Sequence, residues 1–549
     1  MENFRVIIFI LAVLISLSAL IEKIKIPNPI FLVVAGFIIG FIPVLPDLVL
    51  DPDIVFLVFL PPLLYDAAFR TSWHDFKADI RPISALGISL VFFTTLAVAI
   101  TAHYFIPAFT WPLAFLLGAI ISPPDAVAAT SIIKGLGLNK RVITILEGES
   151  LVNDASALIA YRYALAAVTT GSFIFWQAGL QFLFVAGGGI LIGIVVGYTL
   201  VSAHKRVNNN PVVETSLTLL TPFLSYLTAE QFHTSGILAV VSTGLVISWR
   251  SSEIFSYQTR MRTRVVWETL IFLLNGFVFI LIGLQLPGIL KQLSSYTLMQ
   301  LIGYGVIISL VTIIVRIVWV FAGAYSTKLV RNKKDKPDAV PVKKDDETNW
   351  KNVLIISWTG TRGILSLAAA LALPLTLYKG AVFPQRPLIL FLCFVVIFIT
   401  LVVQGLSLPL LVKWLGVKPG SNEDKETKEL QLYIVTNTLH FIDNEFTDGP
   451  GTSFKETLKK KYESIARTLT REIRTHRHNE KKDEHLPVVI VTPVQEAQMA
   501  IGKFQRELLL KLHKEGAFSD TAIKEAERNM DIDDLKLNQL MPKANNAEI

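Results

Sequence analysis

Apolar stretches long enough to cross a lipid bilayer recur along most of this chain. A helix needs about 20 predominantly apolar residues to cross the hydrocarbon core of a bilayer. We count thirteen such stretches, at about 4–22, 27–43, 52–70, 82–106, 112–134, 142–170, 174–203, 211–230, 233–250, 263–288, 297–326, 350–374 and 386–416. Only helices and closed barrels satisfy all their backbone hydrogen bonds in lipid. The sequence therefore predicts an all-α polytopic membrane protein.

The composition supports this class. Hydrophobic residues make up 52% of the 549 residues and charged residues 17%, whereas about a quarter of a soluble domain is charged. The first stretch is not followed by a small-residue cleavage site, so we interpret it as a retained span and not as a signal peptide. The lone Cys393 lies within a predicted span, which excludes an intrachain disulfide.

Basic residues between the apolar stretches predict the orientation of the chain. With the N-terminus outside, the cytoplasmic loops would hold 22 Lys and Arg residues and the opposite loops only 4. Cytoplasmic loops of membrane proteins carry this excess of positive charge. The C-terminus is therefore expected in the cytoplasm, at the inner face of the cell membrane. The net charge of +7 follows from this asymmetry, and nothing in the sequence indicates nucleic-acid binding.

The composition changes abruptly after the last apolar stretch. Residues 417–549 are rich in Lys, Glu, Asp and Asn, with apolar positions at helical spacing in 453–474 and 494–516. This pattern predicts a cytoplasmic, mostly helical C-terminal tail with a regulatory or assembly role. The tail contains no catalytic motif.

One apolar stretch carries charged and polar residues that are expensive to bury. In "LEGESLVNDASALIAYR" (146–162), a helix would place Ser150 and Asp154 on one face and Glu149 and Asn153 on the next, since residues four apart share a face. A charge in hydrocarbon costs about 3 kcal/mol or more and commonly marks an ion pathway. A hydroxyl and a carboxylate are hard oxygen ligands, so Ser150 and Asp154 predict half of a cation site.

The preceding stretch supplies a candidate for the other half. "GAIISPPDAVAAT" (118–130) places two consecutive prolines and Asp125 in the middle of a predicted span. Prolines remove backbone donors and clash with the preceding turn, so the helix is expected to break there. Broken helices at the bilayer midplane are typical of ion sites in secondary transporters.

A second interrupted stretch, "SWTGTRGILSLAAALALP" (357–374), has Gly360 and Gly363 flanking Arg362. It lies seven stretches after the first, and an odd offset reverses its orientation in the membrane. Stretches 1–6 and 8–13 could therefore form an inverted repeat. Arg362 also offers a fork-shaped guanidinium to Glu149 and Asn153, and we interpret these three as structural support.

A third acid, Asp66, follows another Pro-Pro pair near the cytoplasmic end of its span. A role in ion access and simple snorkelling to the interface remain equal alternatives for it. Arg162 and Arg316 also lie within apolar stretches, and we expect structural ion pairs for both, with Glu268 as a candidate partner of Arg316.

Six motifs, taken in order, resemble those of the sodium/proton antiporters of the NhaP/NHE type, particularly the bacterial members. They are "FLPPLLYDAAF" (59–69), "ISPPDAVA" (121–128), "EGESLVNDASAL" (147–158), "SGILAVVSTGL" (235–245), "FLLNGFVFILIGLQL" (272–286) and "TGTRGILSLAAALALP" (359–374). The resemblance covers about residues 1–416. It implies a homodimer in which a core domain (about 82–170 and 297–416) moves against a dimerisation domain (about 4–70 and 211–288).

The resemblance also implies roles for individual residues. The Asn-Asp pair of the family falls on Asn153 and Asp154, with the aspartate binding both cation and proton. Its cation-ligating serine falls on Ser150, its glutamate–arginine pair on Glu149 and Arg362, and its remaining membrane acids on Asp125 and Asp66. Many relatives have Thr-Asp-Pro where this chain has Ser-Pro-Pro-Asp, which leaves Ser122 and Pro124 as alternatives for completing the ion shell.

These features together predict a secondary transporter that exchanges Na⁺ for H⁺, with electroneutral 1:1 stoichiometry, and serves pH and sodium homeostasis. It would not be an enzyme, and it would need no cofactor beyond the transported ions. Li⁺ and K⁺ remain alternatives to Na⁺, because selectivity depends on cavity size and ligand number. A proton-sensing cation channel or membrane receptor is the competing interpretation, but a channel would need a continuous polar lining. An intramembrane aspartyl protease is a weaker one, since the sequence lacks a Gly-x-Gly-Asp segment.

Overall fold

The structure is a computed structural model that describes residues 2–21, 28–41, 57–125, 140–170, 175–207, 210–331, 350–377, 381–416, 421–444, 452–475 and 493–539. Within these ranges all regular secondary structure is helical, apart from an isolated bridge between Thr376 and Val382. The prediction of an all-α protein is confirmed.

The helices of the apolar part follow the predicted stretches closely. In chain order they are α1 (Glu2–Ile21), α2 (Asn28–Gly40), α4 (Leu60–Arg70), α5 (Trp73–Ala78), α6 (Ile80–Ser84), the π-helix η1 (Ala85–Leu90), α7 (Val91–Phe105), α8 (Trp111–Ile121), α10 (Lys140–Thr170), α11 (Phe175–Arg206), α12 (Pro211–Gln231), α13 (Gly236–Ile254), α14 (Tyr257–Gln292), α15 (Leu298–Arg331), α16 (Trp350–Trp358), α17 (Ile364–Leu371), α18 (Arg386–Ile399), the π-helix η2 (Thr400–Gly405) and α19 (Leu406–Leu415).

Each of the thirteen predicted stretches overlaps a helix, although residues 52–56 and 126–134 lie outside the described ranges. Among the described residues, 6 helical segments are long and apolar enough to cross a membrane, and three shorter apolar helices accompany them. The number of thirteen crossings and the inverted repeat stay predictions.

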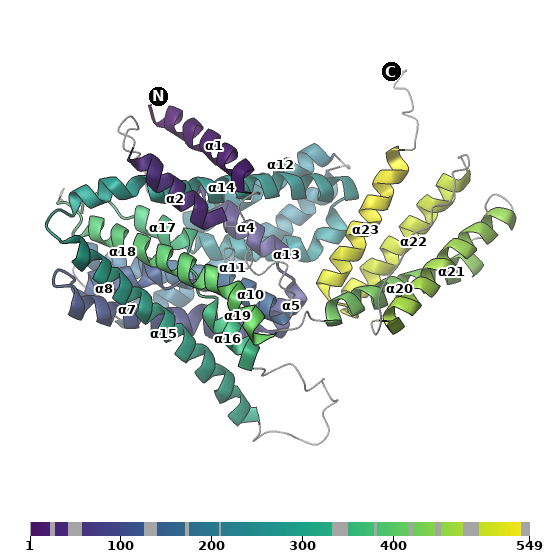
Figure 1. The fold of residues 1–549 in the computed structure, drawn as a ribbon. Coiled ribbons are helices and arrows are strands. Elements are labelled where there is room, and N and C mark those ends of the chain that lie inside the picture. Colours follow the sequence, from purple (N-terminus) through teal and green to yellow (C-terminus); the bar gives the residue numbers. More distant parts are fainter. Residues whose placement is uncertain are drawn as a thin grey trace.

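Close helix packing organises the membrane part into a bundle (Figure 1). The helix α2 lies along α14, where a Cβ added to Gly36 would lie 2.2 Å from the carbonyl oxygen of Ile280. A Cβ on Gly283 would likewise lie 2.2 Å from the carbonyl oxygen of Val33. Small residues let helix backbones approach where lipid supplies no hydrophobic driving force between helices. These two glycines therefore fix the α2–α14 contact.

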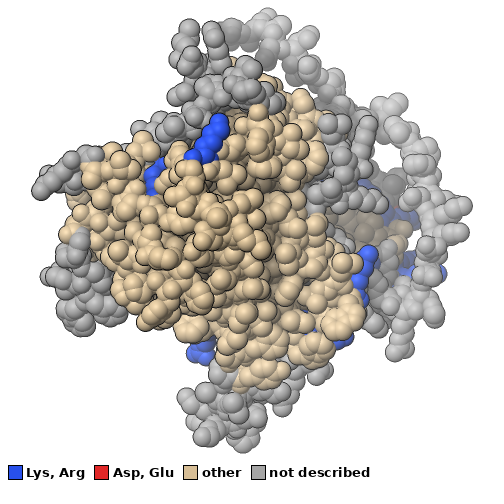
Figure 2. Space-filling model, turned by 60° about the vertical axis from the view of Figure 1, so that its left-hand side comes forward, with Lys and Arg blue, Asp and Glu red and all other residues tan. Residues whose placement is uncertain are grey.

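The face of the molecule in Figure 2 is almost entirely uncharged where its residues are described, with a few Lys and Arg side chains near its margins. Large apolar side chains are exposed along the helices, for example Phe92 and Phe93 on α7 and Leu310 and Ile314 on α15. Apolar surface of this extent on a soluble protein would promote association. It suits a surface in contact with lipid.

Both predicted interruptions are present. The helix α8 ends at Ile121, and residues 122–125 continue in a non-helical conformation. The α16–α17 stretch is broken at residues 359–363. The Pro-Pro pair and the Gly-flanked segment thus interrupt their helices where the sequence placed the breaks.

The tail forms four helices among its described residues: α20 (Ser421–Asn444), α21 (Thr452–Thr475), α22 (Pro493–Glu515) and α23 (Asp520–Gln539). They share small apolar cores, one of which joins Leu430, Leu509 and Ile523. The helical content predicted for the tail is confirmed. The helix α23 also lies against α5 and α14 of the membrane part (Figure 1).

Candidate functional site

The helix α10 carries the polar residues of 146–162 as two stripes. It is continuous from Lys140 to Thr170, so residues four apart face the same way. Glu149 and Asn153 are buried, with exposed fractions of 1% and 0%. Ser150 and Asp154, on the neighbouring face, are partly exposed. The two predicted faces are present in the structure, and they differ in burial: Glu149 and Asn153 are buried, whereas Ser150 and Asp154 are partly exposed.

The two broken segments cross in front of this helix. The backbone N–H of Asp125 donates to the carbonyl oxygen of Thr361 at 2.7 Å, and the Thr361 hydroxyl donates to the carbonyl oxygen of Asp125 at 3.1 Å. Non-helical backbone is tolerated at membrane depth only where its polar groups find partners in the protein or line a cavity. The crossing supplies such partners for both segments at once.

Side chains satisfy the backbone groups that the breaks expose. The Nε–H of Arg362 donates to the carbonyl oxygen of Ile121 at 2.9 Å, and Asn153 Nδ2 donates to that of Pro124 at 3.0 Å. Arg362 also donates to the Gly360 carbonyl, and its own backbone N–H donates to Thr400 at 3.0 Å. The last carbonyls of a helix need partners outside it. Asn153 and Arg362 therefore hold the end of α8 in place.

Two acidic side chains, Asp154 and Asp125, lie at the crossing. Their carboxylates are close enough to interact electrostatically, and no side chain of the described residues donates a hydrogen bond to the Asp154 carboxylate. Two neighbouring carboxylates repel each other unless a cation or a proton lies between them. The geometry can therefore bind a small cation or a proton at Asp154.

The predicted partner of Glu149 was wrong. Glu149 forms a two-pronged ion pair with Arg316 of α15: Arg316 Nη2 donates to Oε2 at 2.9 Å and Nη1 donates to Oε1. Arg316 also donates to the carbonyl oxygen of Ile356, the third-last residue of α16, at 3.1 Å. Arg362 is instead committed to backbone carbonyls at the breaks. Arg362 thus contacts both breaks, whereas Arg316 pairs with Glu149 and contacts α16.

A signal for the Arg316 pair existed in the sequence. Arg316 stands alone in the apolar run "VTIIVRIVWVF" (311–321), and charged residues inside membrane spans usually pair with one another or with backbone carbonyls. Glu268, the candidate we considered, pairs with Arg264 at 3.0 Å instead. Arg162 pairs with Glu230 at 2.6 Å. The expectation of ion pairs for Arg162 and Arg316 is therefore confirmed, whereas the choice of Glu268 is not.

Two further predicted residues have local partners. Asp66 accepts from Arg70 Nε, one turn later on α4, at 2.8 and 2.9 Å. It also lines a cavity of about 290 Å³ bounded by α4, α13, α14 and the tail helix α23. The Ser122 hydroxyl turns back to the carbonyl oxygen of Ala119 at 3.2 Å. Each of the two alternatives for completing the ion shell thus has a partner within the protein: the Ser122 hydroxyl donates to Ala119, and the Pro124 carbonyl accepts from Asn153.

Comparison with known proteins decides the family. Residues 8–414 match the family described as "Sodium/hydrogen exchanger, transmembrane". The chain belongs to the sodium/hydrogen exchanger family. This exchanger is therefore a multi-pass membrane transporter and not an enzyme, and the resemblance noted in the sequence is confirmed. Its predicted activity, sodium/proton exchange, is confirmed at the level of the family.

Individual relatives agree. The exchanger is 34% identical over 454 residues to a protein of Bacillus pumilus named a sodium, potassium, lithium and rubidium/H⁺ antiporter; the match covers 80% of this chain but only 64% of that protein. An uncharacterized Na⁺/H⁺ exchanger of Mycobacterium tuberculosis is 29% identical, with 97% of this chain and 96% of its own length covered. The fold resembles that of the sodium proton antiporter MjNhaP1 from Methanocaldococcus jannaschii at pH 8, with a TM-score of 0.59, 19% identity, and coverage of 75% of this chain and 99% of the other.

Replacing Gly363 with alanine is expected to impair exchange by about tenfold or more. A Cβ at this position would lie 1.7 Å from Asp125 Oδ2 and 2.6 Å from Asp125 Cβ. The carboxylate or the whole segment must then shift, and overpacking of this kind costs about 1–3 kcal/mol. Exchange in proteoliposomes checks this, with Gly303→Ala as the matched control, because its Cβ would meet nothing within 4 Å. Equal exchange rates in the two variants would contradict the tight contact.

Proposed function

We propose that this protein exchanges Na⁺ for H⁺ across the cell membrane at a single site centred on Asp154. The observation that carries the proposal is the position of Asp154, a partly exposed carboxylate beside Asp125 where two broken helices cross. Protonation removes the charge that binds the cation, so the two substrates compete for one group. The exchange in turn supports pH and sodium homeostasis.

The other site residues divide into ligands and support. Ser150 lies one turn before Asp154 on the accessible face of α10, and its hydroxyl offers a second oxygen to the cation. Asp125 adds negative charge. Asn153 and Arg362 hold the backbone of the breaks, while Glu149 and Arg316 brace α10 against α15 and α16.

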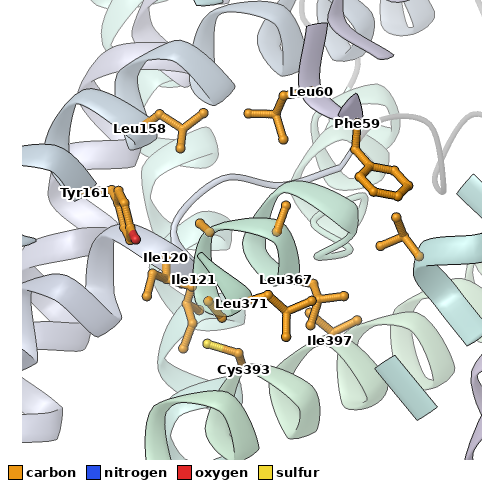
Figure 3. Close-up of a cluster of buried hydrophobic side chains, with 14 of the residues drawn as sticks. Phe59, Leu60, Ile120, Ile121, Leu158, Tyr161, Leu367, Leu371, Cys393 and Ile397 are labelled. Atoms are coloured by element: carbon orange, nitrogen blue, oxygen red, sulfur yellow. The ribbon is translucent and has the colours of Figure 1, made fainter. Parts of the chain in front are cut away.

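An apolar cluster supports alternating access. Buried side chains of α4, α8, α10, α17 and α18, with Phe59 just before α4, belong to one apolar cluster. Figure 3 shows part of it and labels Phe59, Leu60, Ile120, Ile121, Leu158, Tyr161, Leu367, Leu371, Cys393 and Ile397. Leu158 and Tyr161 follow Asp154 by one and two turns of α10. With the N-terminus outside, this cluster lies between the site and the outside, whereas the Asp66 cavity opens on the cytoplasmic side. The described state would then be closed to the outside, and transport requires a second state that opens it.

We extend the proposal to the assembly. The helices of residues 4–70 and 211–288 would form a homodimer interface, and those of 82–170 and 297–416 the moving core. The α2–α14 packing within the first group supports treating it as one rigid unit. The tail, 417–549, would be cytoplasmic and regulatory, since α23 lies against α5 and α14.

The proposal is tested with purified protein in liposomes that contain a pH-sensitive dye. Addition of Na⁺ outside is expected to drive H⁺ out of the liposomes as Na⁺ enters, so the internal pH rises. Additions of Li⁺ and K⁺ rank the cations. Choline, which cannot enter an oxygen-lined cation site, serves as the ionic-strength control. Equal dye responses to Na⁺ and choline would overturn the proposed exchange.

Exchange is expected to be electroneutral. The residue before Asp154 stays neutral throughout the cycle, because Asn153 is a fully buried amide that donates to Pro124 and an amide does not gain or lose a proton at physiological pH. If Asp154 alone alternates between Na⁺ and H⁺, each half-cycle moves one positive charge and the full cycle moves none. Exchange measured under a potassium–valinomycin potential of either sign should then keep the same rate and end-point. A response to the potential would bring Asp125 into the cycle as a second proton carrier.

A further inference from the structure

Two histidines and an aspartate converge where the tail meets the membrane part. His74 lies on α5, His513 on α22, and Asp520 is the first residue of α23. His74 Nδ1 lies 3.3 Å and His513 Nε2 lies 3.2 Å from the same oxygen, Asp520 Oδ1. All three ligand atoms lie within 4.8 Å of one another. Three segments far apart in the chain thus present their side chains to one point.

One oxygen of the Asp520 carboxylate is held by hydrogen bonds, and the other lies close to both imidazoles. Oδ2 accepts from the Ser72 hydroxyl at 2.9 Å and from the His74 backbone N–H at 3.3 Å. Oδ1 is buried and makes no hydrogen bond with the residues that the structure describes, although both imidazole nitrogens are near. Neither ring N–H is therefore aligned with it. Two imidazole nitrogens close to one carboxylate oxygen form a set of ligands that is common at metal sites.

The spacing fits a small divalent cation. In a tetrahedral zinc site the metal–ligand distances are about 2.0–2.2 Å, so neighbouring ligand atoms lie roughly 3.3 Å apart. The two measured nitrogen–oxygen distances, 3.3 and 3.2 Å, match that edge. Imidazole ligands favour zinc and similar transition metals, whereas Mg²⁺ and Ca²⁺ prefer oxygen. Three protein ligands leave a fourth position for water.

We propose that His74, His513 and Asp520 bind a divalent transition-metal cation of the Zn²⁺ type, which ties the tail to the cytoplasmic side of the membrane part. The proposed exchange does not use this ion. A bound metal would therefore depart from the expectation that the protein needs no cofactor beyond the transported ions. The proposal stands or falls independently of Asp154.

The carboxyl group is suited to the role at neutral pH. An aspartate is ordinarily ionised there, and a metal ligand must be deprotonated.

The site lies beside other contacts of the same helix. Arg260 of α14 forms an ion pair with Asp531 of α23 at 2.6 Å, and Lys524 donates to Ser248 of α13 at 3.2 Å. The cavity that contains Asp66 is lined by Lys524 and Asp531 on its tail side. A metal at His74, His513 and Asp520 would hold α23 in this position and so keep the tail against the cavity.

Metal titration of the full-length protein in detergent, with any affinity tag removed, tests the site. We expect saturable binding of one Zn²⁺ per chain and a Zn²⁺-dependent rise in melting temperature, since a ligand that binds only the folded state stabilises it. His74→Ala and His513→Ala should each weaken Zn²⁺ binding by more than about tenfold, because even outer-shell partners of a metal contribute 10–100-fold. Excess Mg²⁺ should not compete.

His440→Ala is the matched control, because His440 is an exposed histidine of the same tail outside the cluster. It should bind Zn²⁺ as the unmodified protein does. The His74 side chain is 42% exposed, so its replacement should leave the protein folded, and unchanged melting without metal verifies this. Absence of saturable Zn²⁺ binding, or equal binding in the His74→Ala and His440→Ala variants, would overturn the proposal and leave a histidine–aspartate ion pair in its place.

Discussion

Replacing Asp154 with asparagine is expected to abolish exchange while leaving the protein folded. Asparagine is nearly the same size but cannot ionise, so it offers neither the charge that binds Na⁺ nor the group that releases H⁺. No described hydrogen bond depends on the Asp154 carboxylate, and removal of its charge relieves repulsion with Asp125. The melting temperature should therefore stay the same or rise. Sodium-driven proton movement in liposomes should fall to the level of protein-free vesicles.

Asp443→Asn provides the control for the same chemical change. Asp443 lies on the tail helix α20, is 43% exposed and pairs with Lys459. An exposed ion pair of this kind contributes only about 0–1 kcal/mol to stability. This variant should exchange normally. Exchange by Asp154→Asn above the protein-free background would rule out a single carboxylate that alternates between the two ions. Asp125→Asn would then be the variant to compare.

The positions of the helices and the two breaks could be predicted from sequence because their causes are local. Apolar length sets where a span lies, and the prolines at 123 and 124 act on the turn that precedes them. The two faces of α10 follow from helical periodicity alone, since Glu149 and Asn153 share one face and Ser150 and Asp154 share the next. These features need no knowledge of the rest of the fold.

The partners of buried charges could not be predicted because they depend on the arrangement of distant helices. Glu149 and Arg316 are 167 residues apart, and Arg362 offered the same guanidinium from another helix. The proposed metal site brings together His74 and Asp520, which lies 446 residues later, because α23 packs against the membrane part. Helical periodicity predicted that the tail is helical, but it carries no information about which surface the tail contacts.

Removing Arg316 is expected to destabilise the protein more than any other single change at the site. Arg316→Ala would leave Glu149, exposed by only 1%, as an unpaired charge in the bundle. Breaking a buried ion pair on one side costs about 3–5 kcal/mol. The melting temperature in detergent should fall by several degrees at least, since about 1 kcal/mol shifts it by 2–4 °C even in domains of 150–250 residues. Glu149→Gln should be destabilising for the same reason, with Arg316 stranded instead.

A double-mutant cycle separates this pair from the alternative with Arg362. Residues in one ion pair show coupling energies of about 0.5–3 kcal/mol, so the effects of Glu149→Gln and Arg316→Gln should be clearly non-additive: the double variant, which contains no stranded charge, should be more stable than the sum predicts. The guanidinium of Arg362 donates to the carbonyls of Ile121 and Gly360. Arg362→Gln should therefore couple less strongly to Glu149→Gln and should remove a backbone anchor at the α8 break. Stronger coupling of Glu149 to Arg362 than to Arg316 would mean that the state measured in detergent pairs the glutamate as the sequence first indicated.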